Sequence, residues 1–166
     1  MLQLELLEPH HELHAFESGN AELDEWLQNA GMTAHRAGTA RVYVWCEQRV
    51  VYGYFAIAPH MVHRVDVPSK LGRGSPDVIP GFLLARLAIH SEIQGQGRGA
   101  ELLILALETM LEAIRAGGGR ILVVDAIDEN AISFYEYHGF KALPDNPSRL
   151  FLKASSAAKS IGIAWP

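Results

Sequence analysis

The chain has 166 residues, a formal net charge of −5 at pH 7 and one cysteine, and 49% of its residues are hydrophobic against 20% charged. These values exclude a disordered, collagen-like or disulfide-stapled chain. No apolar run reaches the ~18 residues of a membrane span, and the acidic start of the chain lacks the features of a secretion signal. We therefore expect a cytoplasmic protein with a single domain over residues 1–153 and a loosely held or partner-bound tail over 154–166.

Charge is unevenly distributed along the chain. Residues 1–34 hold seven acidic residues and no basic one, whereas residues 35–98 hold eight basic and four acidic residues. An acidic chain does not attract nucleic acid through its overall field, but a locally basic segment can hold a polyanion. The candidates for such a groove, which are otherwise ordinary solvated surface, are Arg36, Arg41, Arg64, Lys70, Arg73 and Arg86.

The N-terminal half of the sequence predicts a strand, a helix and a hairpin. A short strand covers residues 2–6, and Asn20 is a suitable N-cap for the helix that follows. β-Branched and aromatic runs at 42–46 and 50–58 predict a β-hairpin. Cys46 shares one face of the first run with two valines, which predicts a buried and unreactive thiol.

The second half alternates strands and helices. Residues 59–81 contain four prolines, which predicts a long loop rather than a regular element. An apolar strand over 82–89 then leads into the sequence SEIQGQGRGA and a helix over 99–115. The later elements are a strand over 121–126, a helix over 130–137 and a strand over 150–152. This order implies an α/β fold in which helices cover both faces of a mixed sheet.

The turn QGQGRGA, from Gln94 to Ala100, lies between a buried strand and the start of an amphipathic helix. Its three glycines allow close approach of the backbone to a ligand, and the free N–H groups at a helix start attract phosphate. The turn lacks the Lys-Ser/Thr of a Walker A loop and the GxGxxG order of a dinucleotide fold. The alternative is a glycine-rich helix entry that binds nothing.

Two segments resemble the GNAT family of acetyl-CoA-dependent N-acetyltransferases. LARLAIHSEIQGQGRGAELLILAL is similar to that family's strand, pyrophosphate loop and helix, and DENAISFYEYHGF is similar to its later helix. The resemblance implies the GNAT fold over residues 2–152, with a mixed, mostly antiparallel central sheet and helices on both faces. It also implies acetyl-CoA as the co-substrate and no metal.

The resemblance further implies roles for single residues. Tyr135 would be the general acid that protonates the departing thiolate, and a phenol with a pKa near 10 suits this role because it stays protonated at neutral pH. The backbone of Leu87, Ala88 and Ile89 would hold the pantetheine arm. Further coenzyme contacts would come from Gln94, Gly95, Gln96, Gly97, Arg98, Gly99, Ala100, Asn130 and Ser133.

The identity of the amine is constrained by the absence of a base. FLLARLAIH contains no carboxylate that could act as a base. An α-amine with a pKa of about 7.7–8.0 is already substantially neutral without a base, unlike a lysine amine. The sequence therefore favours an α-amine acceptor. His90 is a candidate for the base or for a substrate contact, and its alternative is a structural histidine. Further candidates for substrate contacts are Arg36, Arg41 and Arg86.

Within the GNAT enzymes, the sequence is most similar to the acetyltransferase toxins of toxin/antitoxin pairs, which acetylate the α-amine of aminoacyl-tRNA. The similar segments are LDEWLQNAG, VVYGYFAIAPHMV, IPGFLLARLAIH, ILVVDAIDENAISFYEYHGF and SRLFLK. This resemblance implies a homodimer and a small ribbon-helix-helix antitoxin. Two alternatives stay open: acetylation of a small amine or a protein N-terminus, and a non-catalytic CoA-binding module.

A histidine-rich segment near the N-terminus is the other notable pattern. It contains His10, His11 and His14 together with Glu12. Because one short exposed segment rarely closes a metal site, we do not expect it to bind a metal.

Overall fold

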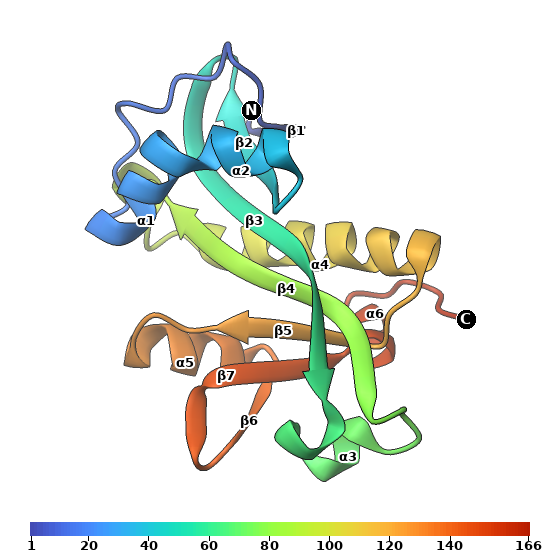
Figure 1. Ribbon diagram of the computed structural model, residues 1–166. Coiled ribbons are helices and arrows are strands. Elements are labelled where there is room, and N and C mark those ends of the chain that lie inside the picture. The colour runs from blue at the N-terminus through green and yellow to red at the C-terminus, as the bar shows by residue number, and fades with distance from the viewer. The chain divides into compact units, whose positions relative to one another are not determined.

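The computed structural model describes residues 1–166 and contains a seven-stranded sheet in the order β1-β2-β3-β4-β5-β7-β6 (Figure 1). The pair β4–β5 is parallel, whereas β1–β2, β2–β3, β5–β7 and β6–β7 are antiparallel. The predicted α/β class with a mixed, mostly antiparallel sheet is therefore confirmed. None of the helices combines the length and the apolar character that crossing a membrane requires.

The chain divides into two compact units. Unit 1 consists of residues 1–58 and 85–106, and unit 2 consists of residues 59–84 and 107–166. The predicted boundary of a single domain at residue 153 stays a prediction.

Unit 1 contains the first two strands and most of the third. β1 (Gln3–Leu6) pairs with β2 (Arg41–Glu47), which pairs with β3 (Val50–His63) as the predicted hairpin. Cys46 is buried beside a register shift in β2, and burial followed by the negative charge of Glu5 raises its pKa to about 11. The predicted burial of the thiol is therefore confirmed, and its raised pKa supports the prediction that it is unreactive.

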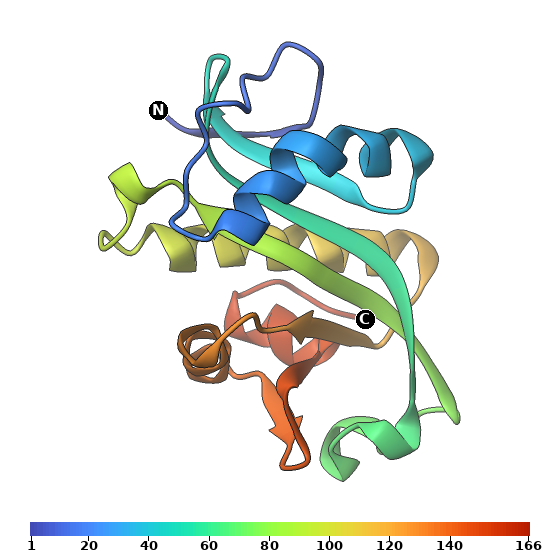
Figure 2. The same cartoon turned by 60° about the vertical axis from the view of Figure 1, so that its left-hand side comes forward.

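The helical segment of unit 1 covers the β2–β3 face (Figure 2). α1 (Ala21–Trp26) begins at Asn20, whose side chain accepts the N–H of Leu23 as predicted. The segment continues through a π-helical turn, η1 (Leu27–Gly31), into α2 (Met32–Ala37). The sequence predicts the helix but not its π-helical turn.

The first part of unit 2 corrects the predicted loop over residues 59–81. β3 runs on to His63, and β4 (Val78–Ile89) begins before the predicted strand, so prolines lie inside both strands. A strand tolerates proline where its missing N–H is not needed, and Pro80 contributes its carbonyl, which accepts the N–H of Arg120 at 2.8 Å. Between the strands lie only η2 (Arg64–Asp66), α3 (Ser69–Gly72) and connecting residues.

The rest of unit 2 follows the predicted order with additions. β5 (Ile121–Asp125) pairs with β7 (Asn146–Lys153), and an unpredicted strand, β6 (Lys141–Leu143), pairs with β7 as a hairpin. α5 (Glu129–Tyr137) lies between β5 and β6 in the sequence.

The tail also differs from its prediction. The sequence predicts a loosely held or partner-bound segment. Residues 154–160 instead form α6 (Ala154–Ser160), with three alanines buried within this chain. Arg115 then donates to the carbonyl of Ala164 at 2.8 Å, and its guanidinium lies 5.3 Å from the ring centroid of Trp165. These contacts hold the end of the chain within unit 2.

Candidate functional site

The glycine turn in unit 1 connects β4 to α4. A 3-10 turn, η3 (Ser91–Ile93), follows the strand, and α4 (Arg98–Gly117) begins after four further residues. Gly95 and Gly97 have φ angles of 79° and 75°, which favour glycine, and a Cβ added at either position would meet nothing within 4 Å. The turn is therefore left-handed at two points, with open space above both.

This open turn suits a phosphate group. The first N–H groups of a helix have no intrahelical partner, and Gln94 to Gly97 are exposed next to the start of α4. The combination of unpaired donors, the positive end of the helix dipole and the open space at Gly95 and Gly97 fits a diphosphate such as that of CoA.

The side chain of Gln94 has a structural role in the turn. Its amide nitrogen donates to the carbonyl of Ile89 at 2.9 Å and to the carbonyl of Ser18 at 2.6 Å. It thus joins the turn to the end of β4 and to the loop before α1. Both N–H groups of the side-chain amide therefore have partners within the protein.

Arg98 is held at the first position of α4. Its guanidinium lies 5.7 Å from the ring centroid of Trp45, and its Nη1 lies 3.4 Å from Glu101. Both partners belong to unit 1, so the side chain is oriented before any ligand arrives.

His90 follows the predicted pantetheine strand, and both of its ring nitrogens contact the backbone. Nδ1 accepts the N–H of Glu92 at 3.1 Å, so the proton lies on Nε2, which is 3.3 Å from the carbonyl of Ala15. The imidazole therefore caps η3 and has no free lone pair. This arrangement supports the structural alternative rather than a base.

Tyr135 lies on α5 in unit 2, as do Asn130 and Ser133. Asp128 caps the helix by accepting the N–H of Ala131 at 2.8 Å. Asn130 and Ser133 are exposed and three residues apart, so they share one helix face. Tyr135 is 6% exposed, and burial raises the pKa of its phenol, which stays protonated throughout the physiological range.

The predicted residues thus fall in both units. Unit 1 holds Leu87, Ala88, Ile89 and the turn from Gln94 to Ala100, and unit 2 holds the three residues of α5. Their assignment to coenzyme binding and proton transfer stays a prediction.

The basic residues predicted for a substrate groove have different surroundings. Arg41 donates to the carbonyl of His35 at 2.7 Å, and Arg64 forms an ion pair with Asp77 at 2.7 Å. Arg36, Lys70 and Arg73 are exposed. Arg36, Arg41 and Arg86 belong to unit 1 and the other three to unit 2, and their role in a substrate groove stays a prediction.

One polar network in unit 2 is missing from the sequence predictions. Arg149 on β7 makes two 2.7 Å contacts with the carboxylate of Asp125, its register partner on β5, and its Nη1 lies 3.3 Å from Nε2 of His60. Burial and then the charge of Arg149 lower the pKa of His60. A cavity of about 320 Å³ lies against His60 and Arg149. The predicted strand over 150–152 begins one residue too late to include this arginine.

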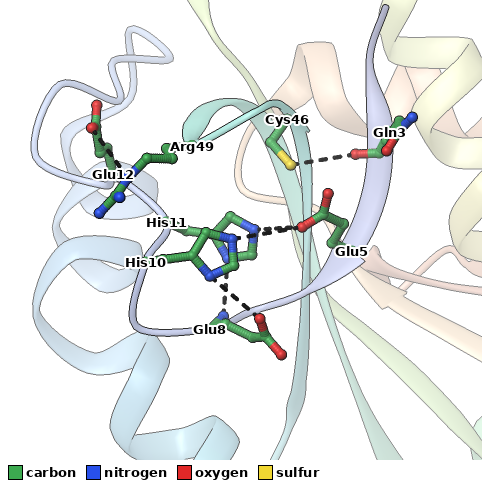
Figure 3. A network of polar contacts seen from close by, with 8 residues as sticks. All are labelled: Gln3, Glu5, Glu8, His10, His11, Glu12, Cys46 and Arg49. Carbon is green, nitrogen blue, oxygen red and sulfur yellow. Dashed lines mark hydrogen bonds and ion pairs between the residues drawn. The ribbon is translucent and has the colours of Figure 1, made fainter.

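The structure brings Glu5, His10 and His11 together in unit 1, with one potential ligand atom of each within 4.8 Å of the others (Figure 3). Nδ1 of His11 accepts the N–H of Glu8 at 3.0 Å, so its Nε2 carries the proton and donates to Glu5 at 2.9 Å. A metal ion would need a free lone pair on a ring nitrogen, and neither nitrogen of His11 offers one. The hydrogen bonds of the buried His11 therefore link β1 to the loop that follows it. Glu12 is not part of this cluster and forms an ion pair with Arg49.

Comparison with known proteins gives consistent results. Residues 38–142 match the model of the acetyltransferase (GNAT) domain. The chain is 34% identical over 148 residues to a tRNA-acetylating toxin of Mycobacterium tuberculosis, covering 89% of each protein.

Two solved structures are similar over nearly the whole chain. One is AtaT complexed with acetyl-methionyl-tRNAfMet, with a TM-score of 0.86, 31% identity and 98% of each chain covered. The other is a mutant AtaT toxin bound to the C-terminus of the antitoxin AtaR and to acetyl-CoA, with a TM-score of 0.82, 29% identity and coverage of 96% of this chain and 98% of that one.

Proposed function

Because the chain belongs to the GNAT acetyltransferase family, we propose that it is an acetyl-CoA-dependent N-acetyltransferase. Its proposed acceptor is the α-amine of aminoacyl-tRNA. The observation that carries the proposal is the open, left-handed glycine turn at the start of α4, in a chain similar throughout to tRNA-acetylating toxins. The protein would then be the toxin of a toxin/antitoxin pair.

The coenzyme would be held mainly by backbone groups. The amides of Gln94 to Ala100 would bind its pyrophosphate, and the backbone of Leu87 to Ile89 would bind the pantetheine arm. Asn130 and Ser133 would contact the coenzyme from α5. When bound, acetyl-CoA supplies an activated acetyl group as a thioester.

Acetyl transfer forms a bond between the amine nitrogen and the acetyl carbon and breaks the bond between that carbon and sulfur. The amine loses one proton, and the departing thiolate gains one. The amine proton would pass to solvent, and Tyr135 would donate its own proton to the thiolate and be reprotonated after the coenzyme leaves. Burial raises the pKa of its phenol, which keeps the donor protonated until that transfer. Desolvation disfavours a thiolate in the same way, so the pKa of donor and acceptor rise together.

The nature of the acceptor is supported by what surrounds β4. The strand carries no carboxylate, and both nitrogens of His90 contact backbone groups. A substrate amine that already has a substantial neutral fraction at pH 7–8 needs no strong base, and an α-amine, with its pKa of about 7.7–8.0, meets that condition.

The proposal extends to partners and location. The similarity to AtaT bound to the antitoxin AtaR, and to the AtaT-AtaR complex bound to DNA, supports a small DNA-binding antitoxin as the proposed neutralising partner. A ribbon-helix-helix fold for that partner, a homodimeric enzyme and a cytoplasmic location, where charged tRNA is available, are the further parts of the proposal.

The test is transfer of radiolabelled acetyl groups by the purified protein. Label on the amino group of charged tRNA, with none on uncharged tRNA, is the expected result. Label only on small amines or on protein N-termini would replace the proposed acceptor, and binding of CoA without transfer would make the protein a binding module.

A further inference from the structure

β4 carries one charged residue within an otherwise apolar strand. Its sequence, VIPGFLLARLAI, is interrupted only by Arg86. A charge in a largely buried strand needs a partner or access to solvent. The surroundings of Arg86 therefore indicate what it does.

Arg86 is held by an aromatic stack. Its guanidinium carbon lies 4.6 Å from the centroid of the Trp26 ring, and that ring stacks on Tyr54 with centroids 6.1 Å apart and planes at 10°. Tyr54 is fully buried, and its hydroxyl donates to the carbonyl of Leu23 at 2.7 Å. The stack thus has a rigid base, and the guanidinium lies over the Trp26 ring in a cation–π contact.

Stacking leaves the edge of the guanidinium available. The N–H groups lie in the plane of the group, so contact through its face does not consume them. Nη1 of Arg86 forms an ion pair with Glu22 at 3.9 Å, and the side chain of Glu22 is 76% exposed. Such a pair is long and screened by solvent. The side chain of Arg86 is itself 24% exposed, so its positive charge is weakly compensated and open to a ligand.

The position of this edge links it to the proposed reaction. Arg86 immediately precedes Leu87 to Ile89, the backbone assigned above to the pantetheine arm. Trp26 is the last residue of α1 and adjoins the π-helical turn η1, a rare conformation that occurs frequently at functional sites.

We propose that Arg86 binds a phosphate of the acceptor substrate, close to the amine that receives the acetyl group. The inference rests on the proposed function and deepens it. A stacked guanidinium is preorganised for two-point contact with a phosphate, and the phosphodiesters of the single-stranded end of a charged tRNA lie next to its aminoacyl group. Small amines and protein N-termini offer no such group, so Arg86 would select for aminoacyl-tRNA.

The experiment compares two acceptors that differ in phosphate. One is charged tRNA, and the other is an aminoacyl-adenosine analogue with an amide linkage and no phosphate. Replacing Arg86 by Ala should raise KM for charged tRNA by about 10-fold or more, the scale of a lost hydrogen bond to a charged group. KM for the analogue and for acetyl-CoA should stay unchanged. The matched control is Arg49→Ala, which removes an exposed arginine of the same unit and should change none of these values.

Two further variants separate phosphate binding from a structural role. The slope of log kcat/KM against log salt for charged tRNA should fall by about 0.7 in Arg86→Ala, the contribution of one single-strand phosphate, but not in Arg86→Lys. Glu22→Gln should lower KM for charged tRNA because it removes the competing carboxylate. An arginine that served only to pair with Glu22 would give no such gain. If Arg86→Ala fails to fold, Arg86→Lys and Glu22→Gln still decide the question.

Three results would overturn the inference. These are equal rises in KM for both acceptors, a rise in KM for acetyl-CoA alone, and an unchanged KM for charged tRNA in both Arg86→Ala and Glu22→Gln. Failure of the wild-type protein to label charged tRNA would instead overturn the proposed function, so the two failures are distinguishable.

Discussion

The ring of Phe140 meets the ring of Tyr135 edge-on, with centroids 5.6 Å apart and planes at 67°. Phe134 makes a second edge contact with Tyr135, at 5.2 Å. The ring is therefore fixed by apolar neighbours, and burial raises the pKa of its hydroxyl. The aromatic packing does not need the hydroxyl, which allows the two contributions to be separated by mutation.

Tyr135→Phe should keep the ring contacts and remove the proton donor. We expect kcat to fall by ~10²-fold or more, the usual scale for a positioned acid, with little change in Tm. Acetyl-CoA affinity, measured by calorimetry, should stay nearly unchanged. Unchanged turnover would remove Tyr135 from the mechanism.

Gly97→Leu should prevent acetyl-CoA binding. The new side chain would enter the open space above the turn, and its positive φ would cost about 1–2 kcal/mol of stability. Gly74→Leu is the matched control, because Gly74 also has a positive φ, of 78°, with nothing near its Cβ position. Both variants should lose similar stability, but only Gly97→Leu should lose affinity in calorimetry. Retained affinity there would contradict the assignment of the turn.

Gly81→Ala should destabilise the parallel pair β4–β5. A Cβ at this position would lie 2.0 Å from the carbonyl oxygen of Ile121, and a backbone carbonyl in a sheet cannot move aside. We expect a loss of about 3 kcal/mol or more, which for a chain of this size lowers Tm by roughly 6–12 °C. Gly117→Ala, with nothing within 4 Å, should leave Tm nearly unchanged in the same thermal scans.

Stability should decrease as the solution becomes acidic. Nδ1 of His35 accepts the N–H of Val42 at 3.0 Å, and burial, followed by the charge of Arg41, lowers the pKa of His35 below its ordinary 6.5. As the pH falls through 6.5, the unfolded chain therefore binds the proton first. The stability that neutral His35 provides is complete above pH 6.5 and is lost as the pH falls toward the folded-state pKa.

His35→Asn keeps an acceptor near the position of Nδ1 and removes the titration. Urea unfolding at several values between pH 5 and pH 8 should give a flatter dependence on pH for this variant than for the wild-type protein. The dependence should not vanish, because the pKa values of His60 and His138 are lowered as well. An unchanged slope would contradict the role of His35.

Local patterns account for what the sequence predicted well. The N-cap at Asn20, the hairpin and the entry into α4 each depend on a few neighbouring residues, and the structure contains all three. The π-helical turn leaves no periodic signal, because apolar residues on it keep nearly helical spacing. α6 did leave a signal, since its buried alanines at 154, 157 and 158 follow helical spacing.

Contacts between distant segments could not be predicted in the same way. The stack of Arg86 on Trp26 joins residues sixty positions apart, and the network of Asp125 and Arg149 depends on strand register. A glycine turn, in contrast, depends only on consecutive residues in the sequence. The backbone conformation of the glycine turn could therefore be predicted from the sequence, whereas the partners of the charged side chains could not.

The buried state of Cys46 has a practical consequence. A thiol reacts with disulfide reagents as the thiolate and only where the reagent can reach it, so in the native protein this cysteine should stay silent. If Cys46 does react slowly, the rate of that reaction would measure how often the β1–β2 pair opens. Because the chain has no other cysteine, one introduced at an exposed position would take up a spectroscopic label alone, leaving the native residue in place.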